Sequence, residues 1–204
     1  DAHYKACLYA GVQIYGTNAE VFPGQWEFQV GTCKGLDIGD HMWMSRFLLR
    51  RVAEKFGVDV TFAPKPFMGW NGSGAHTNYS TKGTREDVDM KCIIKQLDNL
   101  AQYHMTCQKL YGEGNEKRLS GGFETSRFDK FSYGVMSRAA SVRIPQQTKD
   151  SGRGYYEDRR PSANCDPYIV ASLVFSATCL GGIHIDEIEA QYADFQKARK
   201  EQDH

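Results

Sequence analysis

Two glutamates near the start of the chain are the first residues whose types and spacing could do chemistry. Glu20 and Glu27 lie on either side of Pro23-Gly24, a dipeptide typical of turns. Residues 25–30 alternate between polar and apolar side chains, the pattern of a half-buried strand. A chain that folds back at this turn brings the two carboxylates together, where they repel each other unless a cation compensates them. The pair predicts a divalent metal site, and two solvated surface glutamates are the alternative.

A second polar stretch, residues 71–82, reads NGSGAHTNYSTK. Its glycines, Gly72 and Gly74, allow close approach of the backbone to a ligand. His76 suits a divalent metal, although a lone histidine is more often structural. Short polar side chains surround these residues, and such a density beside glycines indicates a site for a small charged ligand. They are Asn71, Thr77, Asn78, Ser80, Thr81 and Lys82.

Arginines mark two later stretches. Arg138 and Arg143 lie in FSYGVMSRAASVRIP, which is otherwise small or apolar, and arginine deep in a core needs an anion such as phosphate or carboxylate. In GYYEDRRP an extended backbone would place Tyr155, Glu157 and Arg159 on one face. Neighbouring Glu and Arg favour a charged cleft. A solvent-facing strand with cross-strand ion pairs is the alternative.

The loop GEGNEKRLSGGFETS, residues 112–126, is rich in glycine and charge. It carries Arg118 and Glu124. A mobile polar loop of this kind can close over a substrate and exclude water, or it can be an ordinary surface loop, and local pattern weighs the two equally.

The periodicity around these stretches predicts the elements that position them. Helices are expected over residues 2–11, 37–56 and 87–111, the second with Asp40 as its cap. A fourth helix is expected to begin at Pro167, behind a cap at Asn164 or Asp166. A last helix is expected through Ile185, Ile188, Tyr192 and Phe195, followed by a frayed charged tail at 197–204. Strands are expected over 58–62 and around Val142 and Ile144. His104 is expected to be structural.

Composition bounds the class of protein. The 204 residues are enough for one large domain, and 41% hydrophobic with 25% charged residues is ordinary for a soluble globular protein. Lys plus Arg equals Asp plus Glu at 25 each, which gives no reason to expect nucleic acid or an anionic membrane as a partner. Six scattered cysteines indicate reduced thiols of a cytosolic-type compartment. The apolar segment 168–180 is too short to span a bilayer.

Together the motifs resemble the catalytic domain of eukaryotic-type glutamine synthetases. GTNAEVFPGQWEFQVG, NGSGAHTNYSTK, GEGNEKRLSG, SRAASVRIP and GYYEDRRPSANCDPY occur in that family's order and at its spacing, over nearly all of residues 1–180. The resemblance implies an α+β fold: a curved, mostly antiparallel sheet with helices packed on its outer face, and a concave face carrying Glu20, Glu27, His76, Arg143, Glu157 and Arg159. Residues 1–182 would form the domain, and 183–204 a C-terminal helix and charged tail.

The resemblance also implies the reaction, in which ATP phosphorylates the side chain of glutamate and ammonia then displaces the phosphate. Mg²⁺ or Mn²⁺ would be bound by Glu20, Glu27, His76 and Glu157. Glutamate would contact Asn71, Gly72, His76, Arg118, Arg138 and Arg159. Nucleotide would contact Glu27, Asn78, Ser80, Arg85, Arg143 and Tyr155. Arg138, Arg143 and Arg159 would neutralise the transferring phosphoryl group, and Glu124 would shield the intermediate and help deprotonate ammonium.

The chain also departs from the family. Phe123 precedes the loop glutamate, where most members have histidine, and the segment after 180 is dissimilar. Members also carry an amino-terminal β-grasp domain and a Glu-x-Glu strand that this sequence lacks, so we expect a piece of a longer or naturally split protein, inactive alone. Members form stacked rings, which implies a decameric homo-oligomer, and the expected compartment is the cytoplasm, with an organellar form left open. Two alternatives are a non-catalytic assembly subunit and a γ-glutamyl ligase with another amine acceptor.

Overall fold

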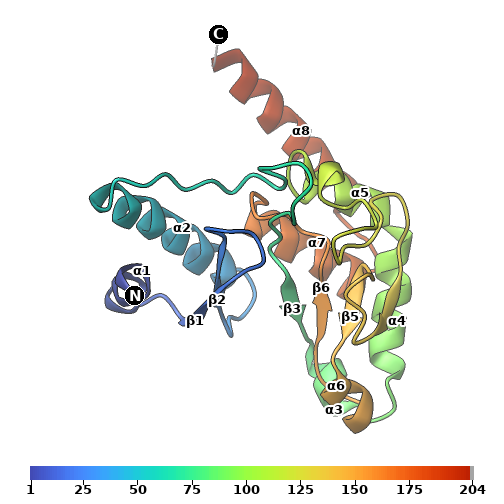
Figure 1. Ribbon diagram of the computed structural model, residues 1–204. Helices are drawn as coiled ribbons and strands as arrows, with labels where there is room; N and C mark the ends of the chain where they lie inside the picture. Colours follow the sequence, from blue (N-terminus) through green and yellow to red (C-terminus); the bar gives the residue numbers. More distant parts are fainter. Residues whose placement is uncertain (203–204) are drawn as a thin grey trace.

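The structure, a computed structural model, describes residues 1–202 (Figure 1). Helices and short strands are interspersed along the chain, and the strands form two separate sheets, which makes the fold α+β. In chain order the elements are α1 (Ala2–Tyr9), β1 (Ile14–Ala19), β2 (Trp26–Val30), α2 (Asp37–Lys55), β3 (Thr77–Tyr79), α3 (Lys82–Glu86), α4 (Lys91–Gln102), α5 (His104–Leu110), the 3-10 turn η1 (Asn115–Lys117), β4 (Tyr133–Val135), β5 (Val142–Ile144), α6 (Gln146–Ser151), β6 (Tyr156–Asp158), α7 (Pro167–Cys179) and α8 (Ile185–Gln202).

The first sheet is the hairpin predicted around Pro23-Gly24. β1 and β2 pair antiparallel, with Ala19 opposite Trp26 and Asn18 opposite Glu27. Phe28 and Val30 pack on a small core made by α1 and the start of β1, as their spacing predicts. The hairpin lies between α2 and the second sheet (Figure 1).

The second sheet has the order β3-β6-β5-β4, with β4 and β5 parallel and the other pairs antiparallel. Its register places Asn78, Glu157 and Arg143 directly opposite one another across three strands. Because side chains alternate along a strand, this row projects from one face while Tyr156 and Val142 project from the other. The second face packs on the main core, and the first carries Glu157 and Arg143.

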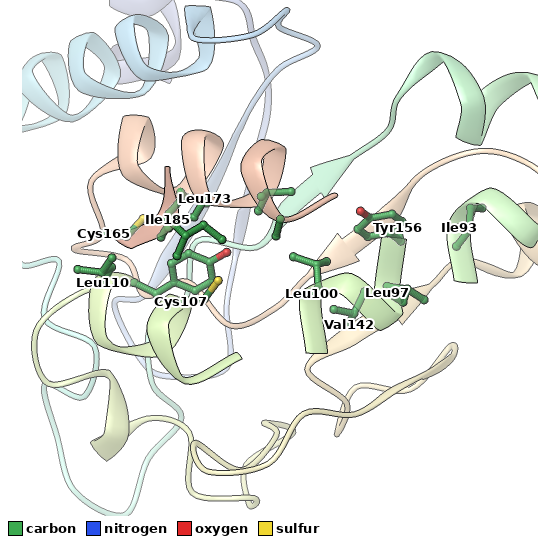
Figure 2. Packing of buried hydrophobic residues seen from close by; sticks show 14 of the residues in the cluster. Ile93, Leu97, Leu100, Cys107, Leu110, Val142, Tyr156, Cys165, Leu173 and Ile185 are labelled. Atoms are coloured by element: carbon green, nitrogen blue, oxygen red, sulfur yellow. The ribbon is translucent and has the colours of Figure 1, made fainter. Parts of the chain in front are cut away.

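Helices α4 and α7 cover the buried face of this sheet. Their apolar residues, among them Leu97, Leu100 and Leu173, pack with Val142 and Tyr156 in the main core (Figure 2). Burying side chains of this size contributes about 1.5–3 kcal/mol each, so the core fixes the sheet on which the charges stand. Within residues 1–202, no helix has both the length and the hydropathy to cross a membrane.

Several expected elements differ in the structure. One sheet was expected to carry all the acidic residues, yet Glu20 and Glu27 belong to the hairpin and Glu157 to the other sheet. Residues 58–62 form no strand, and the helix expected over 87–111 is broken at Tyr103 into α4 and α5. An isolated apolar run has no neighbouring backbone to pair with there, and pairing decides whether it becomes a strand.

Helix starts follow local chemistry in one case and not in another. Asp166 caps α7 by accepting a hydrogen bond from the Tyr168 amide at 2.9 Å, with Pro167 in the first turn, as predicted. The cap expected for α2 is wrong: Leu36 precedes the helix, and Asp40 lies within it and accepts a hydrogen bond from the Tyr168 hydroxyl. The expected tail at 197–204 continues α8 as far as Gln202, and residues 203–204 lie outside the described part.

Candidate active site

Glu157 on β6 is the centre of a compact charged cluster. Its carboxylate lies 3.3 Å from Nδ1 of His76, 3.3 Å from Nη1 of Arg159 and 2.5 Å from Nε of Arg143. Only 8% of the Glu157 side chain is exposed. Strand register explains the gathering, because Arg143 is the cross-strand partner of Glu157 and Arg159 is its same-face neighbour along the chain.

The cluster controls its own protonation. Burial alone raises the pKa of Glu157, but the hydrogen bond and charge of His76 and the charges of Arg159 and Arg143 outweigh it and lower that pKa to about 2. Burial lowers the pKa of His76, so the imidazole is neutral near pH 7. An ionised carboxylate beside a neutral imidazole is a donor set that Mg²⁺ or Mn²⁺ accepts.

One of the arginines has capacity left for an anion. Nε of Arg159 is buried and has no hydrogen-bond acceptor among the described residues, whereas Nε of Arg143 faces the Glu157 carboxylate at 2.5 Å. A buried guanidinium N–H without an acceptor costs about 1–3 kcal/mol, which a bound anion would recover. A phosphoryl or carboxylate oxygen is the acceptor that such groups fit best.

Glu20 and Glu27 form the second acidic pair. Burial, followed by the hydrogen bond and the charge of Glu27, raises the pKa of Glu20, while the charge of Arg138 acts in the opposite direction. The side chains therefore meet across the hairpin turn. Part of the raised pKa comes from the second carboxylate, and a dication would relieve that repulsion.

Arginines connect the two acidic groups. Arg138 acts on Glu20 and also donates from Nη1 to both carboxylate oxygens of Glu124 at 3.1 Å. Nη2 of Arg159 donates to the Glu124 carbonyl at 3.3 Å, and Arg159 itself contacts Glu157. Within the described residues, no three His, Cys, Asp or Glu side chains are grouped for one metal, so each pair offers two ligands.

Arg138 lies in a different environment from the one expected. Its side chain is 62% exposed, whereas that of Arg143 is 28% exposed. The small residues around Arg138 belong to a turn after β4, in which Met136 has a positive φ, so their size does not indicate a core. Arg138 is free to hold the loop glutamate at the surface.

The loop tip carrying Glu124 has an uncommon backbone. Phe123 and Glu124 have φ of 52° and 58°, the left-handed region that side chains other than glycine rarely adopt. The ammonium of Lys65 lies 4.2 Å from the centroid of the Phe123 ring, and the Thr125 amide donates to the Gly122 carbonyl at 3.0 Å. The tip is a tight turn that points its glutamate at Arg138.

Arg118 is buried beneath the glycine stretch. Its Nη2 donates to the carbonyls of Arg159, Arg160 and Pro161 at 3.1, 2.7 and 3.0 Å. Burial lowers its pKa to about 10, so it remains a cation at neutral pH. Its Nη1 and Nε2 of His76 both lie against Gly74, and Gly72 has no room for a side chain. Arg118 therefore holds the end of β6, beside Asn71 and the two glycines.

The remaining nucleotide candidates lie at the far end of β3. Nη1 of Arg85 donates to Oγ of Ser80 at 2.9 Å. Because Tyr79 pairs with Tyr156, the half-exposed Tyr155 lies next to Ser80. Asn78 is exposed opposite Glu157. This edge is open and lies one strand length from the glycine stretch.

One buried network was not predicted. Asp158 and Arg160 are fully buried, and Arg160 donates through Nε and Nη2 to the two carboxylate oxygens of Asp158 at 2.9 and 2.8 Å. The Tyr111 hydroxyl donates to Asp158, and His104 faces Arg160 Nη1 at 3.3 Å. Alternation places this pair on the face opposite Glu157, but nothing in the sequence distinguishes which face is buried.

Comparison with known proteins adds a separate line of information. The family model for the glutamine synthetase catalytic domain matches residues 2–99. The chain is 54% identical over 182 residues to a glutamine synthetase of Emericella nidulans, covering 89% of this chain and 51% of the relative. The chain belongs to the glutamine synthetase family. Glutamine synthetases of Mus musculus, 54% identical over 185 residues, and of Brassica napus, a chloroplastic form 56% identical over 181, match in the same way.

The share of each relative that these matches cover limits what family membership implies for this chain. They cover 88% of this chain in both cases, but only 49% of the mouse protein and 42% of the Brassica protein. The chain thus spans about half the length of the curated relatives it matches, or less. Family membership is shown, and the activity of a whole subunit is a further step.

Proposed function

We propose that this chain is the catalytic part of a subunit that joins ammonia to glutamate at the expense of ATP. The observation that carries the proposal is the Glu157 cluster: a buried carboxylate in contact with His76, Arg143 and Arg159, with Nε of Arg159 left for an anion. Phosphoryl transfer needs positioning and charge neutralisation more than covalent help, and this cluster supplies both.

Two dications would complete the site. Glu20 and Glu27 would hold one near the reacting glutamate, and His76 and Glu157 would hold the other near the nucleotide phosphates. Mg²⁺ or Mn²⁺ fits because oxygen ligands dominate and one imidazole is tolerated. When bound, such an ion polarises phosphoryl oxygens and offsets their charge. Each pair offers two protein ligands, so water, phosphate or residues beyond this chain would fill the remaining positions.

The arginines would act on the transferring group. An oxygen of the glutamate side chain attacks the γ-phosphorus of ATP, ADP leaves, and a γ-glutamyl phosphate forms. Arg143 and Arg159 would donate to the phosphoryl oxygens, and Arg138 would add charge from the loop side. The remaining contacts proposed are those of the glutamate substrate with Asn71, Gly72, His76 and Arg118, and those of nucleotide with Glu27, Asn78, Ser80, Arg85 and Tyr155.

Glu124 would guard the second step. Ammonia attacks the carbonyl carbon of the acyl phosphate, and phosphate leaves. An acyl phosphate hydrolyses readily, so a loop that excludes water has a chemical reason to exist. The carboxylate of Glu124 would accept a proton from ammonium at the mouth of the site, once substrate anions compete for its present partner, Arg138.

The wider setting is part of the proposal. In the complete subunit the hairpin and the second sheet would belong to one curved, mostly antiparallel sheet with helices outside. Residues 1–182 would form the catalytic domain and 183–204 a terminal helix and tail. The subunit would assemble into rings. The cytoplasm is the proposed compartment, with an organellar form as the alternative, since relatives named cytoplasmic and chloroplastic both match.

An assay on the native protein that carries this chain tests the proposal. Formation of ADP should require both glutamate and ammonia, and Arg143→Ala should reduce the chemical step by about 10²–10³, the effect of losing one transition-state donor. A change confined to the glutamate KM would contradict the phosphoryl role of Arg143. A native protein that forms no glutamine at all would favour the non-catalytic assembly subunit instead.

A further inference from the structure

One side chain of the hairpin that carries Glu20 and Glu27 is hydrogen-bonded to the segment that precedes the second sheet. Nε2 of Gln25 donates to the Gly72 carbonyl at 3.1 Å and to Oγ of Ser73 at 2.9 Å, and its Oε1 accepts from the Phe22 amide at 3.4 Å. Both amide hydrogens and the amide oxygen are therefore in use. These bonds join segments almost fifty residues apart in the chain.

An aromatic contact supports the same junction. The Phe22 ring, at the tip of the hairpin turn, stacks on Phe67 with centroids 4.9 Å apart and meets Trp70 edge-on at 5.3 Å. The aromatic contact stabilises the junction but does not fix its geometry, because stacked rings can shift relative to one another. The hydrogen bonds of Gln25 are directional and fix that geometry.

The segment that Gln25 contacts is itself fixed relative to Glu157. The Ser73 carbonyl accepts from the Ala163 amide at 3.0 Å, and the Ala75 amide donates to the Pro161 carbonyl at 2.9 Å. Residues 161–163 follow Arg159 and the end of β6, the strand that carries Glu157. A Cβ on Gly72 would lie 2.5 Å from the Pro64 carbonyl oxygen, so this segment packs closely against Pro64.

Elsewhere the hairpin packs on α1 and α2, away from the Glu157 cluster. A two-stranded hairpin is only marginally stable alone, and its tip moves most easily. Glu20 follows β1 directly and lies at that tip. A bond from the tip to a fixed segment is therefore what would hold its carboxylate at one distance from the cluster.

We propose that Gln25 is a positioning residue, which sets the Glu20–Glu27 carboxylate pair against the His76–Glu157 cluster so that both can serve one substrate. The proposal rests on the function proposed above. It assigns Gln25 no contact with metal or substrate. Ligand geometry in metal sites tolerates only small displacements, so losing the bonds should weaken metal binding at the hairpin.

The experiment is a Mn²⁺ titration of the native protein followed by electron paramagnetic resonance, which reads free and bound ion without turnover. Gln25→Leu removes both hydrogen bonds at similar volume, and Ser73→Ala removes one acceptor with little risk to folding. Gln146→Leu is the matched control, because Gln146 makes an exposed bond to Asp150 within α6. Glu27→Gln removes a proposed ligand. Thermal unfolding of every variant reports stability separately.

We expect Gln25→Leu to weaken Mn²⁺ binding about tenfold at one class of site, Ser73→Ala to weaken it less, and the double variant to weaken it no further than Gln25→Leu. Wild-type Mn²⁺ affinity in folded Gln25→Leu would overturn the inference. If Gln25→Leu does not fold, wild-type affinity in Ser73→Ala overturns it instead.

The same titration separates this inference from the proposed function. If Glu27→Gln loses a site while Gln25→Leu keeps it, only the inference fails. If Glu27→Gln binds Mn²⁺ as the wild type does, the hairpin holds no metal, and the metal assignment of the proposed function fails together with the inference.

Discussion

Single residues of the site are held in their ionisation states by their neighbours. Glu157 has a pKa of about 2 although it is buried, because cationic and hydrogen-bonding partners outweigh the loss of hydration. Glu20 has a raised pKa because burial and Glu27 act together on it. The pKa values of these two glutamates are therefore shifted in opposite directions. Glu157 is ionised beside its cationic partners, whereas burial and a second carboxylate oppose ionisation of Glu20.

Close packing at Gly72 leads to a prediction. Gly72→Ala would place a Cβ 2.5 Å from the Pro64 carbonyl oxygen and 2.5 Å from Cγ of Arg118. The backbone oxygen cannot move aside cheaply, so we expect a loss of stability of about 1–3 kcal/mol, measured by urea unfolding. Gly122→Ala is the control, because its Cβ would meet only Oγ of Ser120 at 3.7 Å. Equal losses in the two variants would contradict this account of the glycine stretch.

At the residue scale, the sequence could predict a side chain's position only where the residues follow the two-residue period of a strand. Alternation along β6 correctly placed Glu157 and Arg159 on one face, because a strand leaves no other choice. The environment of Arg138 could not be obtained in that way. Small neighbours suggested a core, whereas the path of the chain makes them a surface turn. The three carbonyls bound by Arg118 likewise depend on tertiary contacts that leave no periodic signal.

A buried ion pair, Asp158–Arg160, connects β6 to the elements packed behind it. Asp158 and Arg160 leave β6 on the face opposite Glu157, with α5 and Tyr111 packed on them. This pair fixes the strand from behind. Strands were predictable only where alternation was clean, as in β2, whereas the break between α4 and α5 was not predictable, because no glycine or proline marks it in the sequence.

Removing one charge of the Asp158–Arg160 ion pair should lower the stability of the protein. Asp158→Asn leaves Arg160 as a buried cation without its counter-charge, which typically costs about 3–5 kcal/mol. The free energy of unfolding measures this loss. Asp129→Asn is the matched control, since Asp129 pairs with Arg127 in solvent, and it should leave stability unchanged. A stable Asp158→Asn protein would show that the pair does not hold β6 in place.

His104, which lies beside Arg160, makes the stability of the protein depend on pH. Its Nε2 lies 3.0 Å from the Phe128 carbonyl, and burial, followed by the charge of Arg160, lowers its pKa to about 4. An unfolded histidine titrates near 6.5, so between about pH 6.5 and 4 the unfolded state takes up a proton that the folded state refuses. Stability from this source is fully present above pH 6.5 and falls as the pH decreases, by an amount on the order of 3 kcal/mol.

His104→Gln should therefore flatten the pH dependence. We expect the free energy of unfolding to decrease less between pH 6.5 and 4.5 than in the wild type, after normalisation at pH 8, where the histidine is neutral in both states. Some decrease remains, because burial also lowers the pKa values of His3 and His76. An unchanged slope would mean that His104 has the same pKa in the folded and unfolded states, which would contradict this account.

Across the whole molecule, the charged groups come from a hairpin, a glycine stretch, a loop and a sheet, and packing on α4 and α7 places them (Figure 1). The order and spacing of five motifs predicted the family from the sequence alone, and the comparison with glutamine synthetases confirms it. The division of the strands into two sheets was not predictable, since register and partner choice depend on contacts across the fold. The chain spans about half of its relatives' length or less, so the complete site is a property of the native subunit.

The most direct test of the central claim follows an oxygen atom. Glutamate labelled with ¹⁸O in its side-chain carboxylate is incubated with ATP, ammonium and Mg²⁺ and the native protein, and the released phosphate is analysed by mass spectrometry. An acyl phosphate intermediate transfers one carboxylate oxygen to phosphate, so the account predicts one ¹⁸O per phosphate, dependent on ammonia and strongly reduced in Arg143→Ala. Unlabelled phosphate formed alongside glutamine would contradict it.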